Sequence, residues 1–279
     1  MLASSPNNIQ LFVIICYLIV LSTSPNTIDV PPDTTGQSQT TERSGIDGGL
    51  QETTMSSMSE AKTSCFQSRG WLMTEFTALF IAFPVTFTFV LRTHSPVPFL
   101  LVFGAGATVY LVLHPGYANR SFYDLKQTIV QLPRIGLLFL LSGALLFLFV
   151  WVGYREWLFD CPIRHRQVWI SILWTYTLFA VYPQEVIYRG FFFHRYRHLF
   201  TNQRQRMHAS AIAFSFAHLI YYHHYSILFS LIGGYLFAHT YQKSRSLIAV
   251  SIEHALYGCF MFTIGLGRFF YTGFDQLLQ

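Results

Sequence analysis

Long apolar stretches follow one another from Trp71 onward, separated by short polar connections. About 20 apolar residues are the length at which a helix crosses a bilayer. Only helices and closed barrels satisfy their backbone in lipid, and these stretches are too continuously apolar for the alternating strands of a barrel. The pattern predicts an all-α, polytopic membrane helix bundle of about seven spans, at residues 71–92, 97–114, 134–154, 168–192, 207–222, 225–242 and 246–268.

The first 70 residues follow a different pattern. Residues 1–22 contain one short apolar run, close in length to the core of a signal peptide but with no Lys or Arg before it, so an anchor, an atypical signal and an over-extended start all stay open. Residues 23–70 are rich in Ser, Thr, Pro, Gly and Gln, and with so few large apolar residues they predict a disordered linker. The membrane domain is therefore expected at 71–279.

Composition supports a membrane setting. Hydrophobic residues make up 52% of the 279 residues and charged residues only 11%, whereas a soluble domain has about 25% charged residues. Membrane lipid is therefore an expected partner. The formal net charge of +5 does not indicate nucleic acid, because the basic residues gather near span ends rather than on one helical face.

The basic residues also predict the topology. The loops after the second, fourth and sixth spans are rich in Lys and Arg, and seven spans put these loops on one side, which the positive-inside rule makes cytoplasmic. The loop at 155–166 on the other side is also fairly basic, which weakens this orientation. The connection at 222–225 is so short that the fifth and sixth spans are expected to be antiparallel neighbours.

Three ionisable side chains lie inside predicted spans, where such groups are costly and usually functional. Glu185, His218 and His254 lie about 15, 18 and 14 Å from the basic edge of the same side, at about 1.5 Å per helical residue. A single buried histidine is more often a hydrogen-bonded core residue. Three groups at one depth on three spans predict instead that they form one site.

A carboxylate and two imidazoles suit hydrolysis, because a carboxylate accepts a proton from water and histidines shuttle protons or stabilise an oxyanion. Two His and one Glu also form a known zinc set, but each His is alone on its span. A metal therefore stays open but is not favoured, and no other cofactor is expected. Arg189 lies one helical turn after Glu185 on the same face. An ion pair between them would weaken Glu185 as a base and leaves an orienting role equally open.

Three stretches, at 184–189, 214–218 and 254–258, resemble in order and span placement the motifs of the CPBP intramembrane proteases. This group contains CaaX prenyl endopeptidases and bacteriocin-processing relatives, and its pattern is Glu-Glu-x-x-x-Arg, Phe-x-x-x-His and His-x-x-x-Asn or Asp. The resemblance covers about residues 168–265. It implies a helical membrane fold with a cavity facing the cytosol, a glutamate that activates water and histidines that assist with the oxyanion. The residues that match the family's pattern are Glu185, Arg189, Phe214, His218 and His254.

Two positions depart from that pattern. The first motif Glu, which the family uses as the water-activating base, is Gln184 here, and an amide cannot accept a proton at neutral pH. The last motif Asn or Asp is Gly258, which removes a polar group from the oxyanion side. Both departures bear on activity more than on fold.

The first functional hypothesis is an intramembrane endopeptidase in which Glu185 activates water and His218 and His254 assist. A helix irregularity near Pro183 could turn Glu185 toward the cavity, and Glu253 is a weaker alternative carboxylate. The expected partner is a peptide or protein with a cleavage site close to the membrane, and the expected location is a bacterial plasma membrane.

Two other hypotheses stay open. A catalytically silent relative that binds membrane segments or prenylated tails would explain Gln184 and Gly258. A proton-coupled carrier would explain the intramembrane charges, although the two halves show no convincing inverted repeat.

Overall fold

The computed structural model describes residues 68–90, 95–114 and 116–271. The anchor or signal predicted at 1–22 and nearly all of the linker predicted at 23–70 lie outside these residues. The described chain divides into a short unit that ends at Glu75 and a main unit that begins at Phe76. The domain bounds that the sequence suggests stay a prediction. The architecture below is that of the main unit.

Every regular element among the described residues is a helix, and each predicted span is helical, which confirms the all-α membrane bundle. Three of the described helices, Arg69–Val90, Leu125–Gly153 and Leu247–Ile264, have the length and apolarity to cross a membrane, and Val97–Leu113 is a shorter apolar helix. In chain order the spans are α3 (Arg69–Thr77) with η1 (Ala78–Ala82) and α4 (Phe83–Val90); α5 (Val97–Leu113); α6 (Leu125–Gly153); α8 (Arg166–Tyr176) through α10 (Phe192–Arg195); α11 (Gln203–Ala217); α12 (His224–Ser244); and α13 (Leu247–Ile264).

Helix α6 begins at Leu125, well before the predicted start of the third span at 134. The Asp124 side chain accepts a hydrogen bond from the Gln127 backbone N–H at 3.0 Å, which satisfies one of the free donors of the first turn. The helix continues through Pro133. The apolar pattern marks only the part of α6 that is rich in apolar residues, and the cap extends the helix into polar sequence.

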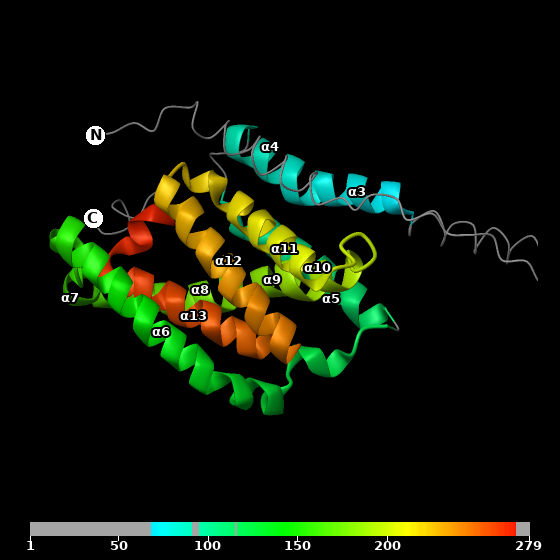
Figure 1. Ribbon diagram of the computed structural model, residues 1–279. Coiled ribbons are helices and arrows are strands. Elements are labelled where there is room, and N and C mark those ends of the chain that lie inside the picture. Colours follow the sequence, from blue (N-terminus) through cyan, green and yellow to red (C-terminus); the bar gives the residue numbers. More distant parts are fainter. Residues whose placement is uncertain (1–67, 91–94, 115, 272–279) are drawn as a thin grey trace, which may run out of the picture. The chain divides into compact units, whose positions relative to one another are not determined.

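Helices α11 and α12 form the predicted antiparallel pair and run alongside one another (Figure 1). Tyr222 turns the chain between them in a left-handed conformation, with φ 52°, and the His223 side chain accepts a hydrogen bond from the Tyr225 N–H. The two helices approach closely at Gly234, where an added Cβ would lie 3.0 Å from Ala211 Cα. Only a glycine at 234 therefore permits this spacing without a backbone shift.

We expect Gly234→Ala to destabilise the protein by about 1–3 kcal/mol, the usual cost of overpacking. Gly136→Ala in α6 is the matched control, because an added Cβ there meets nothing within 4 Å. The control should be neutral or stabilising by up to about 1 kcal/mol, from helix propensity alone. Unfolding of both variants in the same detergent would test this, and equal losses would contradict the close approach at Gly234.

The three basic loops that the sequence places on one side do meet at one end of the main unit. His194 lies with its Nε2 3.0 Å from His114 Nδ1, and the hydroxyls of Tyr117 and Tyr241 are 3.5 Å apart. These contacts join the ends of the second, fourth and sixth spans.

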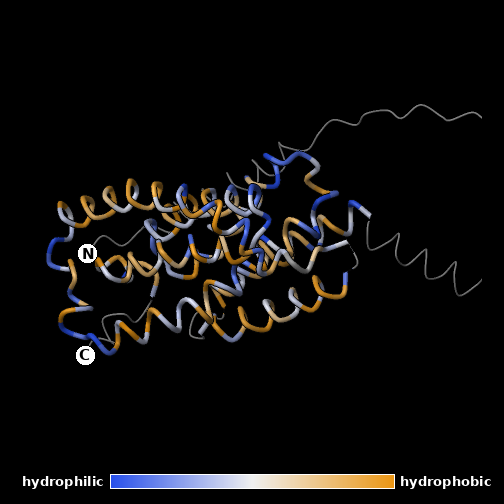
Figure 2. The backbone as a smooth tube through the Cα atoms, turned by 90° about the horizontal axis from the view of Figure 1, so that it is seen from below, coloured by the Kyte–Doolittle hydropathy of each residue, from blue (hydrophilic) through white to orange (hydrophobic). Residues whose placement is uncertain are grey.

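The loop at 155–166 packs with the C-terminal part of the chain instead. Arg268 Nη2 donates a hydrogen bond to Asp160 Oδ2 at 3.1 Å, and Arg164 pairs with the other Asp160 oxygen at 3.2 Å. Figure 2 shows hydrophilic stretches concentrated at turns and apolar residues along the helices. This distribution fits helices that meet lipid along their length.

Candidate functional site

The fourth span carries the first motif on an irregular helix. Its helical run is continuous, but two π-helical segments, η4 (Thr177–Val181) and η5 (Val186–Phe191), enclose a single α turn, α9 (Tyr182–Glu185). Helix α5 packs tightly against this turn, since a Cβ at Gly104 would lie 3.0 Å from Pro183 Cβ. π-Helical segments are rare and are frequent at functional sites.

Glu185 joins two of the predicted site residues in the interior. Its side chain is fully buried. His254 Nδ1 donates a hydrogen bond to Glu185 Oε1 at 2.7 Å, and Arg189 Nε lies 3.2 Å from Oε2, an ion pair without hydrogen-bond geometry. Arg189 is also fully buried and donates from Nη2 to the Gly234 carbonyl at 3.2 Å. The ion pair that the sequence suggested between Glu185 and Arg189, one helical turn apart, is therefore present.

His218 lies at the end of the fifth span, in the 3₁₀ turn η6 (His218–Tyr221). Its Nδ1–H donates to the Phe214 carbonyl at 2.8 Å. A carbonyl only accepts, so this bond fixes the proton on Nδ1 and leaves Nε2 of the neutral ring as the proton acceptor. The second motif therefore holds one histidine in one tautomer.

Aromatic rings hold these groups together. The Phe214 ring centroid lies 4.7 Å from that of His218 and 5.4 Å from that of His254. Phe237 stacks on the His254 ring at 4.5 Å, and the Arg189 guanidinium lies 4.5 Å above the Phe214 ring. The structure thus brings together the groups that the sequence placed at one depth.

An apolar cavity of about 490 Å³ lies beside this cluster, between α4, α5, η5 and η6. Gln184 and His218 are among its lining residues, whereas Glu185 and His254 are not. The expected turn of Glu185 toward the cavity is not seen, because α9 points Gln184 there and buries Glu185 behind it. Gln184 Oε1 is buried with no hydrogen-bond partner among the described residues.

Gly258 lies one turn after His254 on α13. An added Cβ at this position would overlap the Tyr176 hydroxyl and ring. The side chain that the family pattern expects at 258 therefore has no room while Tyr176 lies there.

Glu253 is a further buried carboxylate on α13, and neither of its oxygens has a hydrogen-bond partner among the described residues. Its charged neighbours are Arg134, Glu185 and Arg189. Arg134 Nη1 donates to Thr240 Oγ1 at 2.8 Å. Positive and negative side chains therefore alternate through the interior, in the order Arg134 on α6, Glu253, Arg189 and Glu185.

Within the described parts of the chain, no group of three or more His, Cys, Asp and Glu side chains is placed to hold a metal ion. The expectation that the site works without a metal or cofactor stays a prediction. Activity that survives a chelator would support it.

A carboxylate, two imidazoles and an arginine therefore lie in a helical membrane bundle beside an apolar cavity. Residues 165–260 match the family model described as Type II CAAX prenyl endopeptidase Rce1-like. This match, over about a third of the chain, confirms the resemblance to the CPBP intramembrane proteases. The chain matches no curated protein and no solved structure.

The motifs alone did not reveal two side chains at the site. Phe237 covers His254 from α12, and Tyr176 covers it from α8, with ring centroids 6.1 Å apart. Both are aromatic residues in spans full of aromatic residues, so the sequence carries no signal that separates them from lipid-facing ones. Gly258 is the one hint, because a missing side chain in a packed interior implies a neighbour that fills the space.

Proposed function

We propose that this chain is an intramembrane endopeptidase that takes the apolar, prenylated end of a protein into its cavity and hydrolyses a peptide bond beside it. The observation that carries this proposal is the pair Gln184 and His218 on the wall of a mostly apolar cavity. A volume of about 490 Å³ lies within the range of about 300–1,000 Å³ typical of ligand pockets. The family match supports the choice of substrate class.

His218 is the group best placed to activate water. Its Nε2 carries the free lone pair, and the bond from Nδ1–H to the Phe214 carbonyl strengthens as the ring becomes positive. Water loses its proton to Nε2 as its oxygen bonds to the substrate carbonyl carbon. The same proton then passes to the departing amine. Gln184, which cannot act as a base, can orient this water or donate its amide N–H to the substrate.

Glu185 acts through His254 in this scheme rather than on water. The carboxylate accepts from Nδ1–H, so it holds the ring in one orientation and stabilises a positive charge on it. The alternative assignment, Glu185 as the base itself, stays a prediction. Cleavage that survives Glu185→Gln, which keeps an acceptor for His254, would exclude it.

The first test is digestion of prenylated and unprenylated membrane peptides by the purified protein. We expect His218→Asn to lower kcat by about 10²–10⁴, the usual contribution of a general base. Asparagine at 218 can still donate a hydrogen bond to the Phe214 carbonyl, so we expect this variant to fold like the native protein. His239→Asn on α12, away from the cavity lining, is the matched control and should retain full activity. Equal activity of the two variants would contradict the role of His218.

A second function is favoured by one observation: the residues that line the cavity include no carboxylate. A protein with this cavity can bind a prenylated segment without cleaving it. Binding of a prenylated peptide by the native protein, with no product at any pH and no loss of affinity in His218→Asn, would establish this silent, binding function.

The location of the protein in a bacterial plasma membrane also stays a prediction. Membrane fractionation would test it.

A further inference from the structure

Residues 186–252 carry positive charge with no acidic residue to balance it. This stretch contains no Asp or Glu, but it contains seven Lys and Arg residues. Arg189 is buried and paired with Glu185. The other six lie at or next to the ends of α10, α11 and α12, at the end of the main unit where the basic loops meet: Arg195, Arg197, Arg204, Arg206, Lys243 and Arg245.

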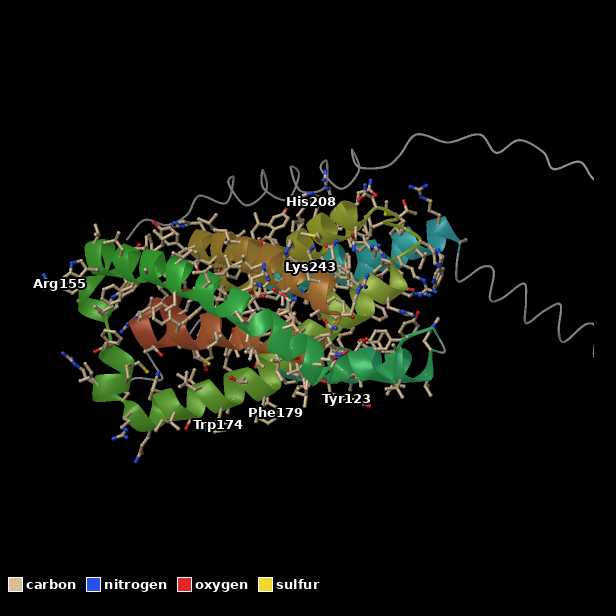
Figure 3. All side chains as sticks on the ribbon, turned by 60° about the horizontal axis from the view of Figure 1, so that its bottom comes forward. Tyr123, Arg155, Trp174, Phe179, His208 and Lys243 are labelled. Carbon is tan, nitrogen blue, oxygen red and sulfur yellow. The ribbon has the colours of Figure 1, made fainter. Side chains whose placement is uncertain are left out.

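Helices α11 and α12 bring four of these cations together. The two helices are antiparallel neighbours, so the first turn of α11 lies beside the end of α12. Near this end, His208 Nδ1 and the Tyr235 hydroxyl are in hydrogen-bond contact at 2.9 Å. Figure 3 shows His208 and Lys243 on these helices, with Arg155 at the opposite end of the bundle. The four cations are Arg204 and Arg206 on α11, Lys243 on α12 and Arg245 at its C-cap.

Arg206 is the cation of this group that most needs an anion. Its side chain is partly buried, and its Nε is buried with no hydrogen-bond partner among the described residues. Arg245, a second cation, is a charged neighbour. Burial of a charge without a partner is costly, and like charges repel one another. An anion that contacts both side chains would offset both costs.

Local structure favours other residues at three of these positions. Positive side chains oppose the helix dipole at the start of a helix, which is where Arg204 and Arg206 lie, and the first turn of α11 contains no acidic residue. Arg245 adopts the left-handed conformation, with φ 51° and ψ 24°, at a helix end where glycine is usual. The three arginines therefore fit a role outside the two helices.

One face of α12 has the order of groups that a phospholipid has. Leu228 and Ile232 lie one turn apart and are exposed, as lipid-facing side chains are. Lys243 follows Ile232 by about three helical turns, so it lies on nearly the same face, and it is also exposed. Acyl chains can therefore lie along the apolar part of this face while the headgroup reaches the cations at the end of the helix.

We propose that Arg206 and Arg245 bind the phosphate of an anionic membrane phospholipid, with Arg204 and Lys243 beside them. Guanidinium groups match phosphate oxygens in charge and geometry. Clusters of Lys and Arg directly beside membrane helices are typical sites for anionic lipids. The exposed apolar face of α12 favours a lipid over a soluble anion or an acidic protein, because neither of these has acyl chains to lie along it.

Native mass spectrometry of the full-length protein measures this binding. The protein is released from micelles that contain equal amounts of phosphatidylglycerol and phosphatidylcholine with the same acyl chains. It should carry phosphatidylglycerol at least tenfold more often, and replacing both Arg206 and Arg245 with Gln should reduce this preference to less than twofold. Arg155→Gln is the matched control, because Arg155 lies over the Trp151 ring at the other end, and it should keep the preference. No preference in the native protein, or an unchanged one in the double variant, would overturn the proposal.

Arg245→Gly separates lipid binding from folding. Glycine adopts the left-handed conformation more easily than arginine, so this variant should melt at the native temperature or above it in a neutral detergent. Its preference for phosphatidylglycerol should nevertheless fall at least threefold. A purely structural role for Arg245 predicts an unchanged preference, and that result would contradict the site.

Two competitors identify the occupant. Inorganic phosphate and polyglutamate are each added to the protein with bound phosphatidylglycerol, beside sodium chloride of the same ionic strength. Neither should displace more lipid than sodium chloride does. Displacement by phosphate would indicate a site for free anions, and displacement by polyglutamate alone would indicate a surface for an acidic protein. Either result would overturn the assignment to a phospholipid.

Discussion

Arg189→Ala should destabilise the protein by about 3–5 kcal/mol, the usual cost of removing one member of a buried ion pair. Both Arg189 and Glu185 have fully buried side chains, so the variant leaves a carboxylate in the interior with His254 as its remaining partner among the groups described. It also removes the hydrogen bond to the Gly234 carbonyl and the cation above Phe214.

Arg164→Ala is the matched control, because Asp160 and Arg164 form the same one-turn pair at the surface. The Arg164 side chain is 76% exposed, and exposed ion pairs contribute about 0–1 kcal/mol. Detergent-solubilised protein unfolded by heat or by added SDS would give both values. A loss for Arg189→Ala no larger than that for Arg164→Ala would mean that water reaches Glu185.

A double variant separates the charge from the packing. Replacing Glu185 with Gln and Arg189 with Met together removes both charges and keeps most of the volume. Well-packed neutral residues often replace a buried ion pair with little loss, so this protein should be more stable than Arg189→Ala. If it is not, the hydrogen bonds of this pair matter more than its charge balance.

Much of the fold was predictable because lipid imposes a simple rule. Apolar length defines the spans, and each predicted span is helical in the structure. The rule fails where a helix continues into polar sequence, as at the Asp124 cap of α6. The rule of apolar length also makes no prediction for short helices in the connections. One example is α7 (Asp160–Arg164), which contains no long apolar run.

The sequence predicts how deep the site residues lie in their spans, but not which way their side chains point. Counting residues from the basic edge gives the level of Glu185, His218 and His254, because the rise per residue is nearly constant. Direction depends on the turn per residue, which the π-helical segments on both sides of α9 alter. The sequence therefore predicted the meeting of these groups and not that Gln184, in place of Glu185, lines the cavity.

Gln184→Glu should raise kcat by about 10²–10⁴, the range that a positioned general base contributes. The side chain at 184 already lines the cavity with His218, so the change adds a proton acceptor at nearly constant volume. Its buried Oε1 has no partner among the described residues, so the change breaks no hydrogen bond found there. KM should change little, because the apolar lining that binds the substrate stays the same.

The control for this gain is Gln203→Glu, an exposed position in the first turn of α11. It adds the same charge, which is favourable near a helix N-terminus, and should leave kcat unchanged. Activity of Gln184→Glu should rise with pH as the new carboxyl ionises, and His218→Asn in that background should lower it again. A variant that folds, binds prenylated peptide and still shows no gain would mean that this cavity binds its ligand without hydrolysing it.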